Sequence, residues 1–516
     1  MSLDETGGAA VQGVEGSPKA GEELPTKLRR GSVGIFEAAF QSFSYVGPAG
    51  DVAILLIGTV LYAGGATPLA VLIAWVLYGL WMVTPVEFSR HITNAGSFYA
   101  YSSRGFNGGG ALALWFWIGE NLTGPAFAVL GLSGFLFVLF SSLSSTGWAW
   151  APIAIATLLF GVVLSYRGVR PSTRFTLVAG SFEALFLIVT AVIIIFKVGP
   201  HNSVTAFTLN TIHNNAHLLF LAVIFSVLDF TGLGTATTLS EELAGSKTKM
   251  YKALWLGWAI SGVALILPAY ALTVGWGIHN MAHYASSADP GLIVYKHFLG
   301  NIGWGILIAV TITSYLSYMV AKVNAVTRIW YSGGRDGIYF RRVSKVHERF
   351  HTPYQAVLLF FVVILAINLI AGGLLGPTNG GLWLLTISGV CIIGVHIVAN
   401  TGLTAFMAKG EHKFNVMLHG VIPSASSIIG GVVIYYSVYP LPSGSVGIAV
   451  IVSLVWLALG FIAWGWYVRR HQDRLRFAGW SRGDDGPVPT AAVATAQAGH
   501  PGVGSGPGTP HPASPA

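Results

Sequence analysis

Long apolar stretches, separated by short polar segments, dominate this sequence. Residues 447–468 are one example, with 22 residues and no charged side chain. A helix that crosses a bilayer needs roughly 20 such residues. Twelve stretches of this kind occur, with approximate limits 34–63, 68–88, 110–141, 147–166, 174–197, 217–239, 253–277, 303–330, 355–375, 380–406, 415–439 and 446–468. The pattern therefore predicts an all-α membrane protein with twelve transmembrane helices.

The composition supports this prediction. Only 9% of the 516 residues are charged and 53% are hydrophobic, whereas soluble proteins carry about a quarter charged residues. The single cysteine, Cys391, lies inside an apolar stretch and has no partner for an internal disulfide. The aromatic segment 94–109, between the second and third stretches, is too short to span, and we expect an interfacial or re-entrant piece there.

Basic residues are distributed unevenly between the two sides of the predicted membrane. If the N-terminus is cytoplasmic, 24 of the 28 Lys and Arg fall in inside segments, and two, Lys197 and Lys296, fall in outside loops. Such an excess marks the cytoplasmic side. We therefore expect a multi-pass protein of the cell membrane with both termini cytoplasmic. The formal net charge of +8 then reflects topology, and nucleic-acid binding is not expected.

Two of the predicted spans contain residues that interrupt a helix. The first carries Gly47, Pro48 and Gly50, and the sixth carries Gly232 and Gly234. Within lipid, every backbone group freed by such a break has to be satisfied in the protein or at a cavity. Paired interruptions at corresponding places in two halves favour a transporter with inverted repeats and a site at mid-membrane. Close helix packing is the alternative role for these glycines.

Three sequence blocks resemble the amino acid–polyamine–organocation transporter superfamily. EFSRHITNAGSFYAYSSRGFN (87–107) is similar to the family's segment after the second helix, and FTGLGTATTLSEE (230–242) to its sixth-helix break with a following Glu pair. Residues 324–356 resemble the end of helix eight and the loop to helix nine, with Arg-Asp-Gly and later Thr-Pro. The order and spacing of the blocks make the resemblance specific over residues of about 30–470.

The resemblance implies the LeuT-like fold, in which two inverted five-helix repeats with broken helices one and six are followed by two extra helices. The domains expected on this basis are a disordered cytoplasmic tail (1–30), a transporter core (31–410) with repeats 31–200 and 215–410, two additional transmembrane helices (411–470), and a cytoplasmic, largely disordered tail (471–516).

The resemblance also implies alternating access to an amino acid or related small amine. In the family, amides of the first break hold the α-carboxylate and carbonyls of the sixth-helix break hold the amino group. The matching substrate-binding candidates are Val46, Gly47, Ala49, Gly50, Phe225, Asp229, Phe230, Thr231 and Gly232. Pro48 departs from the family pattern and has no N–H to donate. An amine without an α-carboxylate is therefore the alternative substrate.

Ionisable residues inside the spans are functional candidates because their burial in lipid is costly. Asp229 could pair with a substrate ammonium, take a coupling proton or cap amides at the break, and Asp51 could cap the second half of the first span. Glu183 stands where, by the resemblance, many proton-coupled relatives carry a lysine. We expect it to act in proton coupling together with Lys322, and a structural Glu183–Lys322 ion pair is the alternative.

Three further acids have two interpretations each. Glu120, in the third span, either faces the cavity or lies within aromatic helix packing. The pair Glu241–Glu242, after the sixth span, is more consistent with ion pairs than with catalysis. The expected basic partners are Lys247, Lys249 and Arg335.

The sequence favours a carrier over an enzyme. It contains no phosphate-binding loop, hydrolase motif or convergent nucleophile and base, and we expect no catalytic residue, metal or cofactor. The leading hypothesis is a proton-coupled symporter, with the lipid bilayer, protons and a small-molecule substrate as its partners. A substrate exchanger and a sodium-coupled carrier are alternatives; for sodium, the eighth span supplies the hydroxyls of Thr311, Thr313, Ser314 and Ser317. A channel or membrane sensor is the non-transporter alternative, which the paired breaks disfavour.

Overall fold

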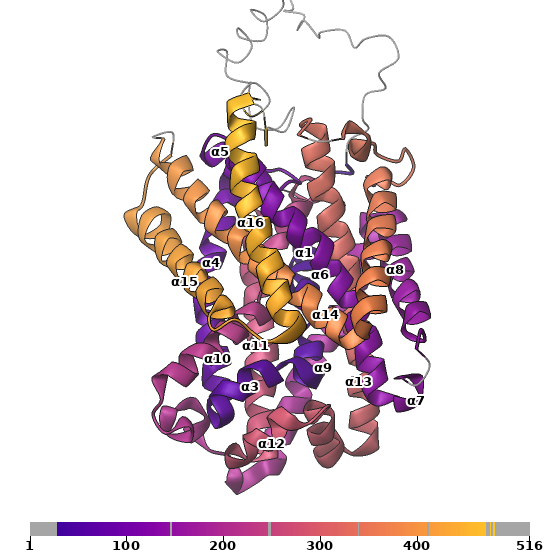
Figure 1. The fold of residues 1–516 in the computed structure, drawn as a ribbon, viewed down its shortest axis with the longest axis vertical. Helices are drawn as coiled ribbons and strands as arrows, with labels where there is room; N and C mark the ends of the chain where they lie inside the picture. Colours follow the sequence, from indigo (N-terminus) through magenta and orange to yellow (C-terminus); the bar gives the residue numbers. More distant parts are fainter. Residues whose placement is uncertain are drawn as a thin grey trace, which may run out of the picture.

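The computed structural model describes residues 28–144, 147–245, 249–338, 340–409, 412–470, 475 and 478–479. Within these residues nine helices are long and apolar enough to cross a membrane, and one further apolar helix, α8 (Trp150–Tyr166), is shorter. The long helices run side by side, with α5 (Phe98–Gly105) near one end of the bundle and α12 (Met281–Ser286) near the other (Figure 1). The prediction of an all-helical membrane protein is therefore confirmed for the described residues. The count of twelve spans stays a prediction.

Helical elements follow one another along the whole described chain, where η marks a 3-10 or π turn. The first half contains α1 (Ile35–Val46), α2 (Pro48–Gly50), η1 (Asp51–Leu55), α3 (Ile57–Ala63), α4 (Thr67–His91), α5, α6 (Gly109–Leu139), α7 (Ser141–Ser144), α8 and α9 (Val169–Val198). The second half contains α10 (Ala216–Asp229), η6 (Leu233–Glu242), α11 (Met250–Trp276), α12, α13 (Pro290–Arg335), α14 (Tyr354–Ala408), η10 (Val416–Val421), α15 (Ile422–Val438) and α16 (Gly444–Arg470).

The 55-residue element α14 consists of two helical segments. Gly376 interrupts it with a φ of 76°, and Pro377 follows. A left-handed glycine and a proline together end one helix and begin another. The two segments correspond to the predicted spans 355–375 and 380–406.

The predicted interfacial segment forms α5. Its residues Phe98, Tyr99 and Tyr101 are buried, and the Tyr99 hydroxyl donates a hydrogen bond to Asp336 at 2.8 Å. This helix therefore packs against the end of α13. The predicted tails 1–30 and 471–516 lie largely outside the described residues.

The first predicted span is broken at Gly47. This residue ends α1 with a φ of 74°, in the left-handed region that glycine adopts without steric cost. Pro48 then starts the short turn α2, and a π turn, η1, follows before the chain resumes as α3. The type of helix therefore changes three times within this span.

The sixth predicted span is broken in the same way. Helix α10 ends at Asp229, Gly232 has a φ of 102°, and the chain continues as the 3-10 segment η6. The structure thus interrupts both spans at the glycines that the sequence indicated.

Two carboxylates at the end of η6 tie this segment to α13. Glu242 is fully buried and binds the guanidinium of Arg328, with a distance of 3.1 Å between Oε1 and Nη2. Glu241 binds Arg335 at 3.0 Å. The predicted Arg335 contact is confirmed for Glu241, whereas Glu242 pairs with a residue inside α13 that the sequence analysis did not consider. The expected partner Lys247 lies outside the described residues.

The predicted orientation can be checked by cysteine labelling. Cys391 is the single cysteine of the sequence, so a Cys391→Ala background has no thiol that reacts with a maleimide. Val204, which is 80% exposed, lies in a predicted outside loop, and Glu348, also exposed, lies in a predicted inside loop. We expect a membrane-impermeant maleimide to label Val204→Cys in intact cells and Glu348→Cys only after permeabilisation. The reverse pattern would contradict a cytoplasmic N-terminus.

Candidate functional site

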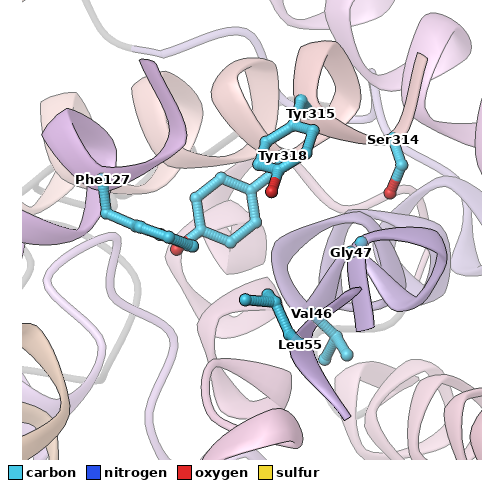
Figure 2. Close-up of a pocket in the computed structure, with 8 residues that line it drawn as sticks. Val46, Gly47, Leu55, Phe127, Ser314, Tyr315 and Tyr318 are labelled. Atoms are coloured by element: carbon cyan, nitrogen blue, oxygen red, sulfur yellow. The ribbon is translucent and has the colours of Figure 1, made fainter. Parts of the chain in front are cut away.

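A small hollow, with a cavity volume of about 20 Å³, lies beside the first break. Its lining comes from the first span, α6 and α13. The residues are Val46, Gly47, Gly50, Leu55, Phe127, Ser314, Tyr315 and Tyr318. Figure 2 shows the rings of Phe127 and Tyr318 close to each other on one side of the hollow. The backbone of Gly47 lies on the opposite side. Three of the predicted binding residues, Val46, Gly47 and Gly50, therefore line a cavity.

The backbone N–H groups of the first break are engaged within the protein. Gly47 N–H donates to the carbonyl of Phe43 at 3.2 Å, and Gly50 N–H donates to the carbonyl of Gly47 at 3.0 Å. The Ala49 N–H donates to Oε1 of Glu183 at 2.8 Å. Because Pro48 has no N–H, this conformation leaves no amide from residues 47–50 for a substrate carboxylate.

Glu183 connects three elements at this point. It extends from α9, accepts the Ala49 N–H at the break and accepts the hydroxyl of Ser314 on α13 at 2.7 Å. The hydroxyl of Thr311, also on α13, donates to the carbonyl of Ala49 at 3.4 Å. A single buried carboxylate thus joins the broken helix to two neighbours.

Asp51 and Asp229 stand at the two breaks without hydrogen-bond partners among the described residues. Asp51 opens η1 and is 4% exposed, and Asp229 closes α10. The Oδ2 atom of each is buried and unpartnered. Coulombic interactions connect the Asp51 carboxylate with those of Asp229 and Glu183. Across the described part of the chain, no group of three or more His, Cys, Asp or Glu is arranged to hold a metal ion.

The second break is held against the first by close packing. The Gly232 N–H donates to the Tyr78 hydroxyl at 3.1 Å, and the Ser42 hydroxyl donates to the carbonyl of Leu233 at 2.6 Å. The ring of Tyr45 covers Gly232 so closely that a Cβ atom there would lie 2.0 Å from the ring. Glycine is thus required at this position by both its φ angle and its neighbour.

The remaining predicted binding residues occupy different surroundings. Phe230 is fully buried beside Tyr78, with ring centroids 6.3 Å apart. Phe225 is 42% exposed and stacks on Tyr62 of α3, away from the lining of the hollow. The Thr231 hydroxyl donates to the carbonyl of Leu228 at 2.8 Å. A direct substrate contact by any of the three stays a prediction.

Lys322 pairs with Glu120 and not with Glu183. Both side chains are 2% exposed, and the Tyr45 hydroxyl donates to the same Glu120 oxygen at 3.0 Å. The Lys322 ammonium also lies 3.8 Å from the ring centroid of Tyr45 and 5.0 Å from that of Tyr318. The alternative interpretation, an ion pair between Glu183 and Lys322, is therefore wrong, because Lys322 binds Glu120 on α6 and Glu183 binds the backbone of Ala49 at the first break.

Sequence reasoning missed the two tyrosines of the hollow. Tyr315, Tyr318 and Lys322 follow one another at intervals of three and four residues, the spacing of one helix face. Two tyrosines on the same helix face as a lysine within an apolar stretch are the signal that could have identified them. Glu120 was recognised, but its partner was not.

Comparison with known proteins identifies the family of this chain. The profile of the family described as "Amino acid permease" matches residues 40–476. The chain belongs to this family. The match includes both breaks, the residues that line the hollow, and the acids Asp51, Glu120, Glu183 and Asp229.

Several characterised permeases are similar to this family member. The low-affinity putrescine importer PlaP of Escherichia coli (strain K12) is 25% identical over 54% of this chain and 62% of its own length. The branched-chain amino acid permease BcaP of Lactococcus lactis is 22% identical over 66% of this chain and 79% of its own. Cationic amino acid transporter 4 of Mus musculus is 24% identical over 63% of this chain and 53% of its own. The matched region thus covers less than two thirds of PlaP.

Replacement of Gly232 by alanine tests the contact between the two breaks. The added Cβ meets the Tyr45 ring, and a non-glycine residue in the left-handed region costs about 1–3 kcal/mol. We expect Gly232→Ala to lower the thermal unfolding temperature of the purified permease in detergent. Gly431→Ala is the matched control, because nothing lies within 4 Å of the Cβ position there. Equal unfolding temperatures for the two variants would rule out the contact.

The Glu120–Lys322 pair can be measured by a double-mutant cycle. Removal of one partner of a buried ion pair costs about 3–5 kcal/mol, since the other charge is left uncompensated. We expect Lys322→Met and Glu120→Gln each to destabilise the permease strongly, and the double variant to lose much less than the sum. Tyr45→Phe, which removes only a hydroxyl donor, should cost about 1 kcal/mol. Additive losses in the double variant would show that the two side chains do not interact.

Proposed function

We propose that this protein is a secondary active transporter that carries amino acids or related small amines across the cytoplasmic membrane by alternating access. The observation that carries the proposal is the pair of interrupted spans at Gly47 and Gly232, with a hollow beside the first. Interrupted helices are tolerated in lipid where they line a cavity or bind something. Similarity to importers and permeases of putrescine, branched-chain amino acids and cationic amino acids supports this substrate range.

The proposed architecture is two inverted five-helix repeats followed by two helices, with both termini cytoplasmic. Breaks in the first spans of the two halves support the repeat, and the 24-to-2 distribution of Lys and Arg supports the orientation. In this arrangement the hollow lies near the middle of the membrane, and a change in the packing of one repeat against the other exposes it to each side in turn.

We assign proton coupling to Glu183. As a carboxylate it accepts hydrogen bonds from both Ala49 and Ser314. Protonation turns one of its oxygens into a donor and weakens its hold on the backbone of the first break. Binding of a proton therefore changes the connection between the first break and α13, which both contribute to the lining of the hollow. Lys322 is paired with Glu120, and its ammonium group contacts the ring of Tyr45 on α1. These contacts stabilise the same region.

Sodium coupling is the second candidate, and one cluster of oxygens favours it. The carboxylate of Glu183, the hydroxyls of Ser314 and Thr311 and the carbonyl of Ala49 meet at one place. Oxygen ligands of this kind suit hard cations. Transport measured with a proton gradient alone and with a sodium gradient alone distinguishes proton coupling from sodium coupling.

The test is transport into liposomes that contain the purified protein, with a panel of labelled amino acids and amines and separate proton and sodium gradients. We expect Glu183→Gln to lose stimulation by the proton gradient and to retain exchange of substrate across the membrane, because glutamine cannot release a proton. A substrate exchanger would show no response to either gradient even before mutation.

Glu37→Gln provides the control for this experiment. Glu37 lies in the first turn of α1, away from the break, and its replacement should leave the gradient response unchanged. Undiminished proton dependence in Glu183→Gln would refute the coupling assignment. A sodium-driven signal that disappears in the same variant would favour the oxygen cluster as a sodium site.

A further inference from the structure

The chain packs against the bundle again after its last long helix. Helix α16 ends at Arg470, and beyond it Leu475 and Ala478 are buried, with 6% and 2% of their surfaces exposed. Ala478 belongs to a hydrophobic cluster that also contains residues of α5, α6 and α14. The end of α16 and α5 lie at the same end of the bundle (Figure 1). We call Leu475, Ala478 and Gly479 the C-terminal strap.

Gly479 is bound through its backbone to two different parts of the fold. Its N–H donates to Oδ2 of Asp336, directly after α13, at 2.7 Å. Its carbonyl accepts a hydrogen bond from the side-chain amide of Asn94, between α4 and α5, at 3.2 Å. The side chain of Asp336 is 5% exposed and Asn94 is fully buried. Both hydrogen bonds therefore lie away from water, where such bonds are strong.

The site that receives Gly479 has room only for glycine. The φ of Gly479 is 78°, in the left-handed region that other residues adopt at a cost. A Cβ atom here would lie 2.8 Å from the carbonyl oxygen of Ala100 and 3.0 Å from Cβ of Ser103, both on α5. Because Ala100 is fully buried, its backbone cannot move aside cheaply. Shape and hydrogen bonding together indicate a specific docking site for the strap.

The two partners of Gly479 are connected to the two breaks. Asp336 directly follows α13, which contributes Ser314 to the hydrogen-bond network of the first break. Asn94 follows α4, which contributes Tyr78 to the sixth-span break. The strap therefore bridges, at one end of the bundle, the helix that holds one break and the helix that holds the other.

The same end of the bundle is closed by further contacts. Glu241, at the end of η6, accepts the N–H of Ala95 at 2.8 Å and binds Arg335 of α13. The Ser332 hydroxyl of α13 donates to Asn94 at 2.8 Å. The strap thus lies on a joint at which η6, α13 and the turn before α5 meet. In the proposed orientation this joint faces the cytoplasm.

We propose that the C-terminal strap is a latch that holds the permease closed toward the cytoplasm. Release of the hydrogen bonds between Gly479 and its partners Asp336 and Asn94 then accompanies the opening of this end, and a docked strap slows that opening. The proposal rests on the proposed transport by alternating access and adds a means of regulation to it, because a change in the docking of the strap changes the rate of opening.

Access to the hollow from the cytoplasmic side is the direct readout. In a Cys391→Ala background, Val46→Cys places a single thiol on the hollow, and a maleimide added to inside-out membrane vesicles labels it faster when this side opens more often. We expect Gly479→Ala, whose Cβ meets α5, to raise the labelling rate about tenfold, which corresponds to a loss of about 1.4 kcal/mol of closure. An unchanged or lower rate would overturn the proposal.

Gly444→Ala is the matched control. Gly444 also has a left-handed φ, of 70°, but nothing lies within 4 Å of its Cβ position. This variant has the same kind of backbone cost without a docking contact, and we expect its labelling rate to match that of the unmodified background. An increase as large as that of Gly479→Ala would show that backbone strain alone causes the effect and would contradict the latch.

Ala478→Glu provides a second way to release the strap. A charged side chain in place of a buried alanine is costly unless it is paired, so the segment should leave its site. We expect the labelling rate to rise as it does in Gly479→Ala. A rate equal to that of the unmodified background would count against the proposal.

Transport distinguishes a latch from a merely structural contact. A latch predicts that the faster labelling of Gly479→Ala is accompanied by initial uptake into liposomes at least as fast as that of the unmodified protein. A structural anchor predicts slower uptake together with a lower thermal unfolding temperature. Slower uptake by this variant would therefore overturn the proposal.

Failure of the latch and failure of the proposed function give different results. If the unmodified protein carries a labelled amino acid or amine while both strap variants are labelled at the unmodified rate, the latch is wrong and the transport function stands. If the unmodified protein carries no substrate of the panel, the transport function itself fails.

Discussion

Satisfaction of backbone polar groups in a medium without water is the constraint on which this structure depends. Each interruption of a membrane helix releases N–H and C=O groups that lipid cannot bind. Here the protein supplies side chains in place of helix carbonyls: Glu183 accepts the amide of Ala49, and the Tyr78 hydroxyl accepts that of Gly232. These two side chains therefore stabilise the conformation of the breaks. A change in the protonation of Glu183 also changes its hydrogen bond to the backbone of the first span.

The burial of charged side chains is the second constraint on this structure. Two ion pairs are buried in the bundle, Glu120–Lys322 and Glu242–Arg328. Each pair has no net charge, and each holds together the two helical segments that it joins. The acids at the breaks are not neutralised in this way. Asp51 and Asp229 each have instead a buried carboxyl oxygen without a partner among the described residues.

The helices, the two interruptions and the family were predictable from sequence because each has a local signal. Apolar length indicates a span, and Gly47, Pro48 and Gly232 mark the breaks without reference to any other part of the chain. The partner of Lys322 was not predictable in this way. Glu120 and Glu183 lie in different spans, and the rotation of each helix about its axis decides which one the ammonium reaches. The same rotation places Tyr315 and Tyr318 on the hollow and Phe225 away from it.

The bidentate contact between Glu242 and Arg328 has a mechanical consequence. Any opening of the bundle at that end has two routes: to pull apart a fully buried ion pair, or to move the end of η6 together with α13 as one rigid body. The second route leaves both hydrogen bonds between the guanidinium and Glu242 intact and needs only a rotation of the backbone elsewhere in the sixth span. Gly232, whose φ of 102° only glycine adopts at low cost, is the position in that span where the helix is already interrupted.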